Sequence, residues 1–175
     1  MSGMKRFVPL LLLAALGFGP ASAQVSALKG HNSNAPVDVA ADRIEVQDRA
    51  DRAIFSGNVV VRQAQLTLTA ARLTVAYSGG GGIELRRIDA TGGVTVRSPS
   101  ETARGNVAIY DLDRKIITLI GNVSLVQKDA KVNGGRLTID LESGRAVMDG
   151  GGPPGTTSQG GRVTGTFTVP QKKGG

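Results

Sequence analysis

The side chains that could carry out chemistry are few, and they lie far apart in the sequence. His31 is the only histidine and the chain has no cysteine, so His31 has no second histidine or thiolate with which to share a metal. Ser22, Ser56 and Ser124 have no histidine in a neighbouring predicted strand that could activate them as nucleophiles. These residue types predict a protein that is not an enzyme and that needs no cofactor.

The acidic residues and the glycine-rich loop also have ordinary explanations. The acids lie at predicted turns and solvent faces, as at Asp48, Asp51, Asp111 and Asp113, where they favour turns and solubility. Residues 78–82 read Ser-Gly-Gly-Gly-Gly, but no Lys-Ser/Thr pair and no helix start follow, as a phosphate-binding loop would require. The sequence therefore directs attention from reactive groups to apolar surface.

The formal net charge of +7 resides mainly at the two ends of the chain. Lys5 and Arg6 lie at one end and Arg162, Lys172 and Lys173 at the other, whereas acids and bases nearly balance between them. The chain has two Tyr, four Phe and no Trp, which is too few stacking surfaces for a binder of single-stranded nucleic acid. The composition therefore predicts no nucleic-acid partner.

The first 23 residues are typical of a secretory signal peptide. Lys5 and Arg6 precede an apolar run over 7–18, and Ala21-Ser22-Ala23 offers a cleavage site, so the mature chain is expected to begin near Gln24. The alternative is an uncleaved anchor, but a spanning helix needs roughly 20 apolar residues. A secreted chain without cysteine has no disulfides, so its core must hold it together.

Period-two alternation of apolar and polar residues predicts an all-β domain over 37–170. Residues 24–36 before it have no pattern and are expected to be a flexible lead-in, and 171–175 a disordered basic tail. A last strand is expected from Arg162 to Val169, ended by Pro170. Turn signals every 8–12 residues favour a sandwich, roll or solenoid. The alternating segments are Val37–Val39, Ile44–Val46, Val59–Val61, Leu66–Leu68, Leu73–Val75, Val94–Val96 and Leu137–Leu141.

An internal repeat refines this prediction. Phe55-Ser56-Gly57-Asn58-Val59 is echoed by Leu119-Ile120-Gly121-Asn122-Val123, and Arg72–Val75 is echoed by Arg136–Ile139 at the same offset of 64 residues (55 to 119, 72 to 136). A fainter copy, Thr91-Gly92-Gly93-Val94, falls between them. The repeat predicts strands joined by Gly-Asn hairpin turns, because both residue types accept the positive φ that such turns need.

The apolar faces of these strands allow two kinds of interior. They carry mainly Val, Ile, Leu and Ala, with Phe55, Tyr77, Tyr110 and Phe167 as the large aromatics. A sealed core is the default, because empty space between the faces would cost stability. A slot open along its length could instead hold acyl chains, and the pattern alone leaves both alternatives open.

The order of several motifs resembles the LptA (OstA-like) family, from about Pro36 to the C-terminus. The motifs are Pro36–Val39, Ala41–Ile44, Ala53–Val61, Ala70–Val75, Tyr110–Leu112, Leu119–Val123, Arg162–Thr164 and Val169–Pro170. The resemblance implies a twisted, V-shaped antiparallel β-jelly roll with open ends. It also implies a periplasmic carrier that stacks head to tail and passes lipopolysaccharide from an inner-membrane transporter, through an LptC-like partner, to an LptD-like translocon.

The resemblance further implies that the lipid A acyl chains lie inside the roll. The residues expected to contact them are Val37, Val39, Val46, Phe55, Val94, Val96, Tyr110 and Leu112. Val94 departs from the family pattern, which often has an aromatic residue there. The inward face around Val107–Tyr110 stays open, because Val107 and Ile109 are also apolar. Four basic residues could meet lipid A phosphates or could simply be solvated, namely Arg86, Arg87, Lys172 and Lys173.

Two further classes of protein remain as alternatives. LptC and the LptD N-terminal domain share the expected fold, but LptC keeps a membrane anchor and LptD continues into a large barrel. A structural β-repeat filament, or an inert scaffold module, would bind no lipid at all. The carrier predicts a lengthwise groove with apolar walls, whereas the filament and the scaffold predict a packed core.

Overall fold

The computed structural model describes Leu28 and residues 31–79, 83–150 and 161–168. The strands form one antiparallel sheet in the order β1-β3-β4-β5-β6-β7-β8-β10, with β2 also paired to β3 and β9 to β8. A 3-10 turn, η1 (Asp48–Ala50), follows β2. The strands are β1 (Val37–Ala40), β2 (Arg43–Gln47), β3 (Arg52–Gln63), β4 (Leu66–Gly79), β5 (Ile83–Arg97), β6 (Glu101–Asp111), β7 (Ile116–Gln127), β8 (Ala130–Asp140), β9 (Arg145–Asp149) and β10 (Thr164–Phe167).

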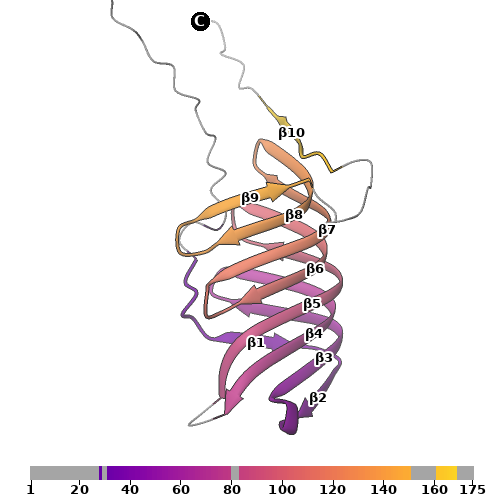
Figure 1. Ribbon diagram of the computed structural model, residues 1–175, viewed down its shortest axis with the longest axis vertical. Coiled ribbons are helices and arrows are strands. Elements are labelled where there is room, and N and C mark those ends of the chain that lie inside the picture. Colours follow the sequence, from indigo (N-terminus) through magenta and orange to yellow (C-terminus); the bar gives the residue numbers. More distant parts are fainter. Residues whose placement is uncertain (1–27, 29–30, 80–82, 151–160, 169–175) are drawn as a thin grey trace, which may run out of the picture.

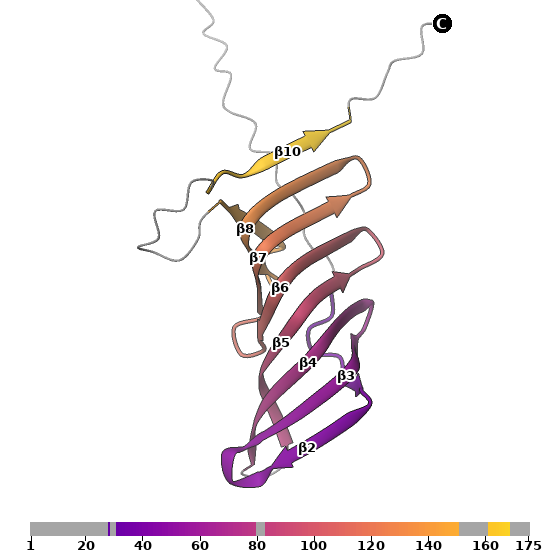
Figure 2. The same ribbon diagram turned by 90° about the vertical axis from the view of Figure 1, so that its right-hand side faces the viewer.

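The long strands β3 to β8 bend near their middles, so the sheet folds into two arms (Figure 1). β2 pairs with residues 52–56 of β3 and β9 with 136–140 of β8, and these halves belong to the first arm. β1 pairs with residues 60–63 of β3 and β10 with 130–133 of β8 in the second arm. Figure 2 shows the strands stacked from β2 at one end to β10 at the other. The predicted twisted, V-shaped antiparallel β-jelly roll with open ends is confirmed.

A line of bulges, which we call the ridge, makes the bend. Three strands each contribute two successive residues with φ between 45° and 84° to it, namely Gly57-Asn58, Gly92-Gly93 and Gly121-Asn122. Each pair lies opposite one residue of the next strand, Ala71, Asn106 or Gly135. Two residues against one is a β-bulge, which bends its strand, and glycine reaches positive φ without steric cost.

The prediction that Gly-Asn forms hairpin turns is therefore wrong. Gly57-Asn58 lies inside β3 and Gly121-Asn122 inside β7, and the chain reverses at other places, such as Ala64-Gln65 and Lys128-Asp129. Positive φ at two successive residues suits a bulged corner as well as a tight turn, and strand alternation flanks both. The offset of 64 residues thus runs from the corner of β3 to the corner of β7.

The hydrophobic core fills the space between the arms. Apolar side chains alternate inward on the long strands, and on β4 this alternation shifts by one residue at the ridge. Leu66, Leu68 and Ala70 are buried on one side of it and Leu73 and Val75 on the other, with two exposed residues between. On β6 the inward residues are Ala108 and Tyr110, while Val107 and Ile109 lie half exposed on the other face. The inward face that the sequence left open is thereby determined.

The last strand is shorter than predicted, and several predicted segments lie outside the described residues. β10 spans Thr164–Phe167, shorter than the predicted 162–169, and all of its residues are exposed. The predicted signal peptide 1–23, the proposed end at Val169–Pro170 and the tail 171–175 lie outside the described residues. Among the residues that are described, no helix has the length and apolar character needed to cross a membrane.

Candidate functional site: the apolar interior of the roll

The first arm presents continuous rows of apolar side chains to the interior, because residues paired across antiparallel strands share a face. The rows start at the exposed Ile44 and Val46 of β2 and end at the partly buried Met148 and Ala146 of β9. One row comprises Ile44, Phe55, Leu73, Ala90, Ala108, Leu119, Leu137 and Met148; the other comprises Val46, Ala53, Val75, Ile88, Tyr110, Ile117, Ile139 and Ala146.

The second arm supplies a matching row on the opposite wall. It comprises Val39, Val61, Leu68, Val96, Ala103, Leu125 and Val132. The two walls meet around one small cleft, lined by Val61 and Leu68 of the second arm and by Ile88 and Ile117 of the first, among others. The interior is thus an apolar passage between two arms that spans the roll from end to end.

Side chains fill this passage in the described structure. The apolar cleft measures about 20 Å³, which is room for a single water molecule and far less than an acyl chain requires. Leu73 and Leu119 are fully buried in it. The lengthwise groove expected of a carrier is therefore closed in this conformation, and the walls must separate, or something must leave, before a chain can enter.

The predicted lipid-contacting residues fall into three groups. Val94, Val96 and Tyr110 are buried in the core between the arms. Val37, Val39, Phe55 and Leu112 are partly buried and pack against that core. Val46 points to the same side as these residues but is 57% exposed, because β2 is the outermost strand of its arm and no further strand covers it.

Sequence reasoning missed a polar group at the rim of the second arm. Gln63 and Glu101 are both buried, although they occupy inward positions among apolar residues. The Tyr110 hydroxyl of the first arm donates to Gln63 Oε1 over 3.1 Å, which ties the two rims together. Gln127 Nε2 donates to Glu101 Oε2 over 3.1 Å. The alternation Val59, Val61, Gln63 held the signal, since it assigns an amide to the inward face.

The same rim binds the chain that precedes β1. Leu28 is buried in the core, and its backbone N–H donates to Glu101 Oε1. Gln63 Nε2 donates to the carbonyl oxygens of Ser33 and Ala35 over 2.9 and 3.0 Å, and His31 Nε2 lies 3.1 Å from Gln63 Oε1. The described part of residues 24–36 therefore contacts the roll through hydrogen bonds and through the buried Leu28.

The interior is apolar apart from a few polar side chains at its rim, such as Gln63, Glu101 and Tyr110. Burial raises the pKa of the Tyr110 phenol above its ordinary value, and its hydrogen bond to Gln63 acts in the opposite direction. Tyr110 is therefore uncharged at physiological pH. No three His, Asp or Glu side chains in the described ranges gather as metal ligands. The interior can hold apolar groups, and its rim offers a few hydrogen-bonding groups.

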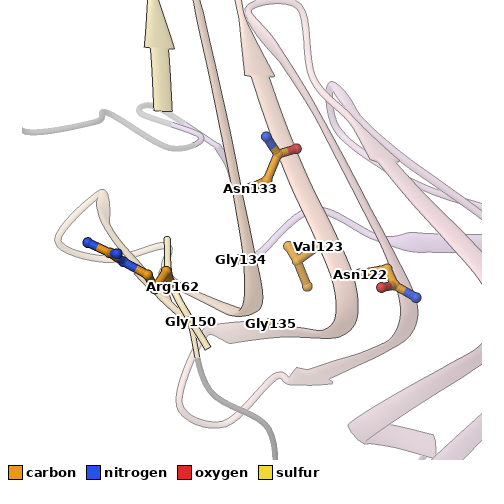
Figure 3. A pocket seen from close by; sticks show the side chains of 7 residues that line it. All are labelled: Asn122, Val123, Asn133, Gly134, Gly135, Gly150 and Arg162. Atoms are coloured by element: carbon orange, nitrogen blue, oxygen red, sulfur yellow. The ribbon is translucent and has the colours of Figure 1, made fainter. Parts of the chain in front are cut away.

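A second hollow lies at the end of the roll where β9 and β10 separate (Figure 3). It measures about 410 Å³ and is lined by Asn122, Val123, Asn133, Gly134, Gly135, Gly150 and Arg162. Its walls are the corners of β7 and β8 together with Arg162, as Figure 3 shows. Polar and small residues therefore line this hollow, in contrast to the apolar interior between the arms.

The basic residues considered for phosphate binding are partnered where they are described. Arg86 Nη2 lies 2.7 Å from Asp113 Oδ2, and Arg87 Nη2 lies 2.8 Å from Asp89 Oδ1. The hydrogen bond and the charge of Asp89 raise the pKa of Arg87. These pairs favour solvated surface charge over a phosphate site, and Lys172 and Lys173 lie outside the described residues.

Fold and interior together define an open-ended β-jelly roll with an apolar lining, and comparison with known proteins places the roll in a family. The chain belongs to the LptA/(LptD N-terminal domain) LPS transport protein family, whose model matches residues 38–145. It is 30% identical over 125 residues to an uncharacterized protein of Rhizobium meliloti (strain 1021), covering 67% of each chain.

Two named relatives extend the comparison. The lipopolysaccharide export system protein LptA of Haemophilus influenzae (strain ATCC 51907 / DSM 11121 / KW20 / Rd) is 25% identical over 144 residues, which cover 79% of this chain and 83% of that protein. The crystal structure of LptH, the LptA-homologous periplasmic component of the lipopolysaccharide transport device of Pseudomonas aeruginosa, superposes with a TM-score of 0.68. It covers 78% of this chain and 98% of LptH at 19% identity, which shows the shared fold.

Proposed function

We propose that this protein carries lipopolysaccharide across the periplasm by holding the lipid A acyl chains between the two arms of the roll. The observation that carries the proposal is the unbroken apolar lining that runs from β2 to β9, in a chain of the LPS transport protein family. Burying acyl chains there would contribute roughly 0.8 kcal/mol per CH₂ group. The sugars would stay in water at the open side of the V.

The open ends support a proposal about partners. Ile44 and Val46 of β2 are more than half exposed at one end, and Phe167 of β10 is exposed at the other. Unpaired outer strands recruit strands of similar proteins by β-augmentation, which also protects the edges from aggregation. We infer that copies of this chain stack head to tail, and that LptC-like and LptD-like rolls continue the stack toward the inner and outer membranes.

Location and chemistry follow from the same reasoning. A signal peptide over 1–23, cleaved near Ala23, would deliver the mature chain to the periplasm. The protein would transfer its cargo without altering it, because the described interior consists of apolar walls with a few hydrogen-bonding groups at the rim. It would therefore act as a carrier and not as an enzyme.

One observation favours a second candidate, a structural β-repeat filament that binds no lipid. The passage is filled by side chains and leaves a cleft of about 20 Å³, as a packed filament module would. A filament would use the exposed ends for stacking in the same way. The two candidates therefore differ in one property, which is whether acyl chains enter the interior.

Site-specific photo-crosslinking in cells tests this difference. A photoreactive amino acid replaces Val39 or Tyr110 on the inner walls, and Thr67 on the outer face of β4 serves as the control. The carrier predicts lipopolysaccharide adducts at Val39 and Tyr110 and none at Thr67. A folded, exported protein that gives no adduct at either inner position would establish the filament instead.

A further inference from the structure

The chain before β1 forms a strap along the open side of the V. The strap is defined as Leu28 and residues 31–36, and Figure 1 shows it running along the side of the sheet before it enters β1. Hydrogen bonds within the strap join His31 N to the Leu28 carbonyl and Ala35 N to the Asn32 carbonyl, over 3.0 and 3.2 Å. Two backbone hydrogen bonds thus form turns within the strap.

The strap lies at the mouth between the arms. Its polar contacts are with Gln63, the last residue of β3, and Glu101, the first residue of β6, and both strand ends belong to the rim of the second arm. Gln63 also accepts from Tyr110, which lies near the rim of the first arm. Leu28 contributes an apolar side chain to the core at the same place. The strap thus covers the route by which an acyl chain would pass from water into the passage.

Gln63 holds the strap against the roll through hydrogen bonds. Its amide nitrogen donates to both Ser33 and Ala35, and its amide oxygen meets His31 and Tyr110, so every hydrogen-bonding site of the amide is engaged. Three of these four partners belong to the strap. If the strap left without a replacement, a buried amide would lose its partners, which is costly in an apolar interior.

We propose that the strap and the acyl region of the cargo compete for one place, so that lipid enters as the strap is displaced and Gln63 exchanges partners. This inference rests on the proposed carrier function. It accounts for the first step of opening, because the departure of the strap uncovers the mouth, after which the two walls must still separate to admit a chain. It also assigns a ligand class: an acyl chain bearing a hydroxyl or amide group near the mouth, which can satisfy the Gln63 amide once Ser33 and Ala35 have gone.

Spin labels can follow the strap directly, because the chain has no native cysteine to interfere. The reporting pair is Asn34→Cys with Arg114→Cys, one exposed site on the strap and one on the connection after β6. The reference pair is Arg62→Cys with Arg114→Cys, which measures the separation of the two arms. Distances are recorded by double electron–electron resonance with and without purified lipopolysaccharide, and bound lipopolysaccharide is quantified in each sample after gel filtration.

The possible results distinguish failure of the strap proposal from failure of the proposed carrier function. The proposal expects the 34–114 distances to lengthen and broaden on binding, by more than the 62–114 distances change. If lipopolysaccharide binds and both pairs change equally, the strap stays on the second arm, and the strap proposal fails while the carrier stands. If no lipopolysaccharide binds, the carrier function fails, and displacement by cargo fails with it.

Variants of the strap provide a second measurement. Leu28→Ala removes the apolar anchor and should raise the apparent affinity for lipopolysaccharide by about tenfold, because less of the protein is held closed. Ser33→Ala is the matched control, since that side chain makes no hydrogen bond among the described residues, and it should leave the affinity unchanged. An unchanged or weaker affinity in folded Leu28→Ala would overturn the competition between strap and lipid.

Discussion

The middle strands and the outer strands of the roll follow one sequence pattern but have different surroundings. Leu73 on β4 and Leu119 on β7 are 0% exposed, because a strand lies on each side and the opposite arm covers them. Ile44 and Val46 on β2 point to the same interior yet are 56% and 57% exposed. Alternation decides which way a side chain points, and neighbours decide whether it is buried. Stability should therefore reside in the middle of the roll and association at its ends.

The largest expected effect comes from a truncation in the middle. Leu119→Ala should lower the free energy of unfolding by about 2–5 kcal/mol, because it removes a fully buried side chain and leaves a cavity. Val46→Ala, in the exposed outer strand, should change it by less than about 0.5 kcal/mol. Urea unfolding followed by circular dichroism measures both. Similar losses for the two variants would remove the distinction between middle and ends.

The ridge should tolerate substitution less well where its corners are crowded. Gly121→Ala should cost about 1–3 kcal/mol, because φ is +80° and the new Cβ would lie 2.6 Å from Asn106 Nδ2. Gly93→Ala is the matched control, with φ of +81° and nothing within 4 Å of the added Cβ. Chemical denaturation of the two variants separates backbone strain from crowding. Equal losses would mean that crowding at Asn106 contributes nothing.

The proposed head-to-tail association can be tested by adding charge to the exposed strand β2. The double variant Ile44→Lys and Val46→Lys should weaken head-to-tail association at least tenfold, or about 1.4 kcal/mol, because it charges an edge that must lose water on stacking. Thermal stability should change little, since both side chains are already exposed. Sedimentation velocity over a concentration series gives the dissociation constant. Unaltered association would place the interface away from β2.

The smallest effect concerns the connection between β8 and β9. The backbone N–H of Ser143, followed by its hydroxyl, lowers the pKa of Asp140, with Glu142 N–H and Arg145 adding smaller contributions. A lowered pKa means that the charged form stabilises the fold above the unfolded value, near 3.9, and that this is lost as the pH falls through the folded value. Asp140→Asn should therefore slightly reduce the loss of stability that the protein shows as the pH falls. Urea midpoints between about pH 6 and pH 3 test this, and identical profiles would exclude a role for the charge.

Much of the fold was predictable, because a strand with one buried face leaves a period of two in the sequence. The pairs Val59–Val61, Leu66–Leu68 and Val94–Val96 marked strands that the structure contains. The corners were not predictable in the same way. Gly57-Asn58 has the chemistry of a tight turn and of a bulge, and only the partner strand, with Ala71 opposite both residues, distinguishes them.

The candidate site was predictable in its walls but not in its rim. Val96 alternates with polar neighbours, so its inward direction follows from the pattern, whereas Tyr110 follows the apolar Ile109 and was expected inside only from the family resemblance. Leu28 lies in a stretch with no period, and its burial depends on contacts with residues far along the chain, such as Glu101. Such contacts leave no local signal. Gln63 does leave a local signal, because a polar residue at an inward position of a strand requires buried hydrogen-bonding partners.

The ridge also governs how long such a roll can be. Bulged strands (β3, β5 and β7) alternate with strands that supply one opposing residue (β4, β6 and β8). Inserting a single strand between two of these would set two strands of one kind side by side and would make the chain leave at the opposite rim. Growth or loss must therefore occur in hairpins, each adding two strand spacings, or roughly 10 Å. The length of one roll along its stacking direction can thus change only in steps of that size. A family of such proteins can span different distances only by adding or losing whole hairpins.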